Sequence, residues 1–174
     1  MATYIQIASV TVGAGGASTA SFSSIPSTYT DLVVLASVRN DGASGNDYGY
    51  MQLIFNGSTA NYSARRILGY STAANSGSGT ILLTPQNTNA ATANTFSNME
   101  IYIPNYNSSN YKSLSINGVT ENNATAAETA FCVTEAGLWS STSALTSLGF
   151  QVYSGYGTTI LQHSTFTLYG ISKS

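Results

Sequence analysis

Hydrophobic and polar side chains alternate with a period of two residues along most of the chain. In residues 4–12, Ile5 and Ile7 lie on one phase of the alternation, whereas Val10 and Val12 lie on the other. Such a change of phase, which falls near Ala8, is typical of a β-strand that carries a bulge. Residues 31–39 contain a run that is apolar on both phases, and this pattern predicts a central strand covered on both faces.

The same period recurs in short segments that are separated by polar or glycine-rich stretches. Further strands are predicted at residues 19–24, 50–56, 62–70, 81–83, 96–103, 111–120, 129–135, 144–153 and 164–171. Clusters of small polar residues favour loops at 41–47, 71–79 and 85–94. The Asn56-Gly57 pair is typical of a tight hairpin turn. A helix is considered only for residues 122–130, whose alanines fit a loop equally well.

About ten short strands at spacings of roughly 8–12 residues predict an all-β fold. We expect one domain over residues 1–174, a β-sandwich or jelly roll of short antiparallel strands. The length suits one domain, and the chain contains no internal repeat or linker.

Charged residues are scarce, at 7% of the chain against roughly 25% in an average soluble domain. Serine, threonine and asparagine together make up just over a third of the residues. The net charge of −2 and the lack of a basic patch argue against a nucleic-acid partner. A surface of neutral hydroxyls and amides associates readily, because little charge repels a partner.

Neither membrane insertion nor secretion is expected. No apolar stretch approaches the roughly 20 residues of a membrane-spanning helix. The first residues also lack the basic segment and the long apolar segment of a signal peptide.

The sequence offers few groups for catalysis or metal binding. His163 is the single histidine and has no second metal ligand at a useful spacing. The 41–47 segment does not place oxygen ligands at alternate positions as a calcium loop does. A pair of carboxylates of the glycosidase type stays open among Asp31, Asp41, Asp47, Glu100, Glu121, Glu128 and Glu135. With so few acids, we expect a protein that is not an enzyme and that holds no metal and no cofactor.

Two further side-chain predictions concern position rather than chemistry. Cys132 lies in an apolar run, so we expect it to be a small buried side chain. Arg65 and Arg66 are adjacent in a predicted strand, so they point to opposite faces and do not form one basic patch.

Tyrosine is abundant, and many tyrosines lie in or beside polar loops. The ring gives a large contact area at low entropic cost, and the hydroxyl forms hydrogen bonds. The candidate interface residues are Tyr48, Tyr50, Tyr62, Tyr106, Tyr111 and Tyr156. Half-buried strand ends, a protein interface and a carbohydrate platform all fit this distribution.

Five segments in the same order resemble a family of virion proteins from tailed bacteriophages. They are residues 25–32, 55–63, 103–106, 137–148 and 164–171, the last of which reads STFTLYGI. Many members of that family carry an acidic residue where Ser58 stands, so no cation site is carried over to it. The resemblance implies a β-sandwich module of the phage particle, often assembled as a homotrimer.

Two functions follow from this resemblance. The first is a capsid decoration (cement) protein on the capsid surface, which binds across neighbouring subunits of the major capsid protein. The alternative is a module of the tail fibre or baseplate that recognises carbohydrate on the host surface. The first is preferred because the chain lacks the coiled-coil, collagen-like and β-helix repeats by which fibre proteins extend.

Overall fold

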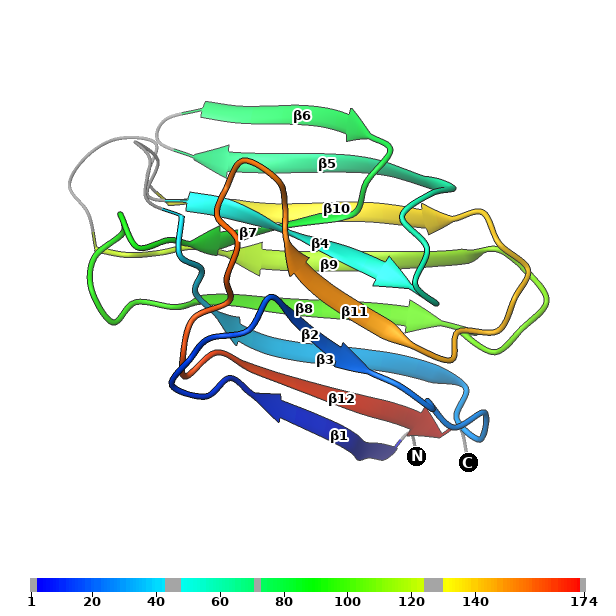
Figure 1. Ribbon diagram of the computed structural model, residues 1–174. Helices are drawn as coiled ribbons and strands as arrows, with labels where there is room; N and C mark the ends of the chain where they lie inside the picture. The colour runs from blue at the N-terminus through cyan, green and yellow to red at the C-terminus, as the bar shows by residue number, and fades with distance from the viewer. Residues whose placement is uncertain (1–2, 43–47, 71–72, 124–129, 173–174) are drawn as a thin grey trace.

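Antiparallel strands form the regular structure of this chain (Figure 1). The computed structural model describes residues 3–42, 48–70, 73–123 and 130–172. Within these residues there are strands and no helix, which confirms the all-β prediction. The strands are β1 (Thr3–Thr11), β2 (Thr19–Phe22), β3 (Asp31–Val38), β4 (Tyr48–Phe55), β5 (Tyr62–Tyr70), β6 (Ala73–Gly79), β7 (Leu83–Asn87), β8 (Ser97–Pro104), β9 (Lys112–Val119), β10 (Cys132–Trp139), β11 (Leu148–Val152) and β12 (Thr165–Ser172).

The strands form two sheets that pack face to face. The large sheet has eight strands in the order β1-β12-β3-β8-β9-β10-β5-β6, and the small sheet has four in the order β2-β11-β4-β7. A hydrophobic cluster lies between them and takes inward-pointing side chains from both sheets. Val34 of β3, Ile101 of β8 and Phe150 of β11 are fully buried in it. The fold is therefore the predicted β-sandwich.

The order of pairing is that of a jelly roll with an extended sheet. The outer strands pair as β1 with β12 and β2 with β11, and the inner strands pair as β3 with β8 and β4 with β7. These eight strands form two sheets of four. The insertions β5–β6 and β9–β10 then continue the large sheet beyond β8.

Three predictions about single strands are confirmed. The register of β1 shifts between Gln6 and Ala8, which is the expected bulge. β3 lies inside the large sheet between β12 and β8, although Leu35 on its outward side is 43% exposed, so only its central position is confirmed. Asn56 and Gly57 both have positive φ angles, as a tight turn after β4 requires.

Other predictions were wrong. Residues 73–79 form β6 rather than a loop, because pairing with β5 holds a segment of low intrinsic strand preference. β7 likewise extends into the predicted 85–94 loop. Cys132 is exposed rather than buried, since the alternation of β10 turns its neighbour Val133 inward. The strand count itself agrees with the expectation of about ten, since the described residues contain twelve strands. Residues 124–129 of the helical candidate lie outside the described residues.

Candidate interaction surfaces

Three of the predicted interface tyrosines gather at the end of the sandwich where β4 begins. The ring centroids of Tyr50 and Tyr156 are 5.0 Å apart, and those of Tyr48 and Tyr50 are 5.7 Å apart. Tyr153 stacks on Tyr156 at 6.3 Å, and the Phe131 ring lies 4.2 Å from that of Tyr48. Because Tyr48, Tyr50 and Tyr156 are half-buried, this aromatic cluster belongs partly to the core and partly to the surface.

The backbone beneath the aromatic cluster is packed too tightly for larger residues. A Cβ atom on Gly49 would lie 2.7 Å from Asn40 Nδ2 and 3.2 Å from Tyr156 Cβ. One on Gly42 would lie 2.5 Å from the Tyr156 carbonyl oxygen. The two glycines therefore allow Tyr156 to pack close to the strands below it.

Asp41 stabilises the loop at the same end of the fold. Its Oδ1 accepts the backbone N–H groups of Thr158 (2.7 Å) and Thr159 (2.9 Å). Burial by itself raises the pKa of Asp41, but these hydrogen bonds outweigh it and hold the pKa below its ordinary value. The carboxylate thus anchors the segment of Thr158 and Thr159 to the end of β3.

Tyr62 and Tyr106 are not surface residues, so their assignment to an interface was wrong. Their exposed fractions are 5% and 0%. The Tyr62 hydroxyl donates to Ser58 O at 2.9 Å and accepts the Phe55 N–H at 2.8 Å, while the Tyr106 hydroxyl donates to Pro26 O. Burial raises the pKa of both phenols. Tyr111 is 58% exposed and lies just before β9, outside the aromatic cluster.

The large sheet turns one broad face away from the small sheet. Cross-strand pairing arranges its side chains in rows that run through all eight strands. The middle row consists of Ser9, Thr167, Leu35, Glu100, Asn117, Thr134, Ile67 and Ser76. Its two neighbours are the row Thr11, Thr165, Ser37, Asn98, Val119, Cys132, Gly69 and Ala74 and the row Gln6, Tyr169, Val33, Tyr102, Ser115, Ala136, Arg65 and Ser78. We call these three rows the outer face.

The outer face is neutral and partly apolar. Glu100 and Arg65 are its charged residues, and hydroxyl and amide side chains fill most other positions. Leu35, Val119 and Ile67 are exposed on it by 43%, 40% and 64%. A shallow hollow of about 510 Å³ lies over β12, β3, β8 and β9, with Leu35 and Glu100 in its lining.

Several charged side chains that are not on the outer face lie inside the protein. Arg39 donates to the carbonyl oxygens of Ala91, Thr92 and Thr95, and burial lowers its pKa. Lys112 is fully buried and donates to the carbonyl oxygens of Ser108 and Ser141, which lie in two different loops. The described surface is consequently even poorer in charge than the composition indicates.

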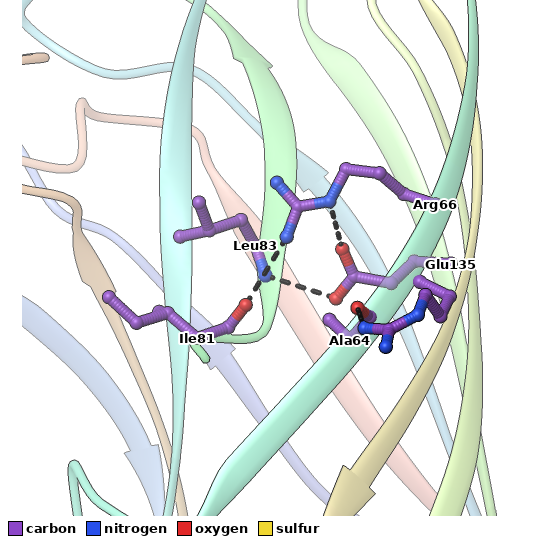
Figure 2. A network of polar contacts seen from close by, with 6 residues as sticks. Ala64, Arg66, Ile81, Leu83 and Glu135 are labelled. Atoms are coloured by element: carbon purple, nitrogen blue, oxygen red, sulfur yellow. Dashed lines mark hydrogen bonds and ion pairs between the residues drawn. The ribbon is translucent and has the colours of Figure 1, made fainter. Parts of the chain in front are cut away.

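Glu135 is a buried carboxylate that faces the small sheet (Figure 2). Its Oε2 lies 2.8 Å from Arg66 Nε, and its Oε1 accepts the Leu83 N–H at 3.3 Å. Burial raises the pKa of Glu135 to about 7, although Arg66 and the Leu83 N–H act in the opposite direction. Arg65 points to the outer face, which confirms that the two arginines are separated.

The arrangement of Glu135 bears on the carboxylate pair that the sequence left open. Its partner is a guanidinium group rather than a second carboxylate, so this pair is not of the glycosidase type. Two of the other candidates, Asp47 and Glu128, lie outside the described residues.

Comparison with known proteins gives no assignment. No family model, curated protein or solved structure matches this chain. Within the described residues, no helix has the length and apolar character needed to cross a membrane. In the same part of the chain, no group of three or more histidine, cysteine or acidic side chains is placed to hold a metal ion.

Proposed function

We propose that this chain is a structural protein of a tailed-phage virion and decorates the capsid surface. The proposal rests on the five segments that resemble phage virion proteins and on the outer face of the large sheet. The jelly-roll order of the strands is compatible with it, since viral capsid proteins are among the proteins that use this architecture.

The outer face is the main structural support for this proposal, because it suits a broad and nearly uncharged contact with another protein. Eight strands about 4.8 Å apart, crossed by three rows about 6.8 Å apart, span on the order of 800 Å². An interface of standard size needs about 800 Å² on each partner. Since Glu100 and Arg65 are the charged residues of the face, few ions lose hydration when a capsid subunit covers it.

In this mechanism the protein stabilises the capsid by burying area across neighbouring subunits. Leu35 and Val119 line the shallow hollow and supply apolar contact, while the surrounding hydroxyls and amides supply neutral hydrogen bonds. The homotrimer that the resemblance implies stays a prediction.

Co-sedimentation with empty capsids of the phage that encodes the chain tests the proposal. The wild-type protein is expected to sediment with capsids, and the double variant Leu35→Glu/Val119→Glu is expected to lose this binding. The matched control is Thr19→Glu/Ser21→Glu, which adds the same two charges to exposed positions of β2. Equal binding by both double variants, or no binding by the wild type, contradicts the proposal.

A second candidate function is recognition of carbohydrate on the host surface by a tail module. The aromatic cluster of Tyr48, Tyr50, Tyr153 and Tyr156 favours it, because sugars stack on half-exposed aromatic rings. Binding of the purified protein to host cells, with no binding to capsids, would reverse the order of the two candidates.

A further inference from the structure

The two sheets of the described structure end in four edge strands, and three of these are poor templates for another strand. β2 has four residues, and β7 has five, of which Pro85 lacks a backbone N–H. β6 consists of alanine, asparagine, serine and glycine, which have low strand preference. β1 differs from them, since its nine residues include isoleucine, valine, threonine and tyrosine.

β1 also lacks most of the features that protect an edge strand. Tyr4 and Ile5 are 60% and 42% exposed. The strand contains no proline and no charged side chain, and the first charged side chain of the whole sequence is Asp31. Edge strands of natural proteins usually carry a charge, a proline or a cover that prevents pairing with another chain. The bulge between Gln6 and Ala8 is the one such feature in β1.

The backbone of β1 has a bonded side and a free side. The Val12 N–H donates to Ser164 O at 2.9 Å, and Val12 O accepts the His163 N–H at 3.0 Å. Backbone groups of an antiparallel strand point alternately to its two sides. The backbone N–H and C=O groups of Val10 therefore point toward β12, as those of Val12 do. The backbone N–H and C=O groups of Ser9 and Thr11 point to the free edge.

We propose that the free edge of β1 pairs with β1 of a second copy of this chain, antiparallel across a two-fold axis. The pairing joins the two large sheets into one continuous sheet, at the margin where Figure 1 shows β1. A second copy fits this edge because two uncharged strands bring no like charges together. The two-fold contact also covers the free edge of both β1 strands, so it does not continue into a fibre through them.

This inference deepens the proposed assembly function and rests on it for its biological role. It predicts a dimer, whereas the resemblance implies a homotrimer. Antiparallel pairing of identical strands is isologous and does not by itself build a three-fold contact.

Analytical ultracentrifugation of the full chain over a range of concentrations tests the pairing. The wild type is expected to be a dimer. Ser9→Pro removes an N–H at the free edge and is expected to raise the dissociation constant by about tenfold or more. Ser9→Ala keeps the N–H and is expected to remain a dimer. Ser9→Lys places a charged side chain on the edge strand of each copy and is expected to be monomeric.

Thermal unfolding of each variant shows whether the monomer is folded. A wild type that is monomeric, or an oligomer that survives both Ser9→Pro and Ser9→Lys, overturns the pairing. Capsid co-sedimentation separates this result from the proposed function. A monomeric wild type that binds capsids overturns the pairing alone, and a Ser9-dependent dimer that does not bind capsids overturns the capsid proposal alone.

Discussion

Arg66 and Glu135 form an ion pair of 2.8 Å on the face of the large sheet that is turned inward (Figure 2). The pair connects β5 and β10 to the segment that leads into β7, because Arg66 also donates to Ile81 O and Glu135 accepts the Leu83 N–H. Room for the arginine comes from β6, where a Cβ atom on Gly79 would lie 3.3 Å from its guanidinium group.

The stability of the protein is expected to depend on the protonation of Glu135. Its pKa is about 7 in the folded protein, against 4.5 for the ordinary side chain. Between these values the folded state binds more protons than the unfolded state, so this group makes stability fall as the pH rises from 4.5 to 7. The slope from one group is at most about 1.4 kcal/mol per pH unit. Urea unfolding at several pH values measures it.

The variant Glu135→Gln is expected to flatten this part of the pH profile, because an amide does not titrate. Glu100→Gln on the exposed outer face serves as the control and is expected to leave the slope in place. If Glu135→Gln leaves the dependence of the unfolding free energy on pH unchanged, Glu135 is not the group that causes it.

Gly170 is expected to tolerate no side chain. The ring of Tyr29 covers it, and a Cβ atom there would overlap the ring. Gly170→Ala is therefore expected to lower the free energy of unfolding by about 1–3 kcal/mol. Gly149→Ala is the matched control in β11, since its Cβ would meet Ile54 at an ordinary 3.6 Å. The penalty at Gly170 is expected to shrink in a Tyr29→Ala background, and an unchanged penalty there is evidence against the contact.

Tyr62 is expected to act in stability rather than in binding. Tyr62→Phe removes the hydroxyl that the buried Phe55 N–H needs as acceptor, which is expected to cost about 1–3 kcal/mol. The exposed Tyr111→Phe is expected to leave the free energy of unfolding unchanged. Chemical denaturation of both variants compares them, and equal stability would count against the buried role.

The last strand is expected to be indispensable. Removal of residues 164–174 deletes β12, which lies between β1 and β3 in the large sheet. It also deletes Phe166 and Leu168, which are fully buried. We expect no soluble folded protein from this truncation, and a monodisperse soluble product in gel filtration would show otherwise.

The alternation of residues by itself determined the class of the fold and most of the strands. It also determined the bulge of β1 and the separation of Arg65 from Arg66, because these features depend on neighbours along the chain. β6 escaped prediction since AANSGSG has little strand preference of its own. Its pairing with β5 is what makes it a strand.

Only the tertiary structure decided which polar side chains enter the core. The sequence around Tyr62 and Tyr106 is polar and that around Glu135 is largely apolar, but in each case contacts with a distant residue accompany burial: Phe55, Pro26 and Arg66 respectively. The order of the strands was likewise fixed by contacts between distant segments, such as β1 with β12. Local preference cannot encode such pairs, because burial and hydrogen bonding between distant residues arise only when the two sheets close on each other.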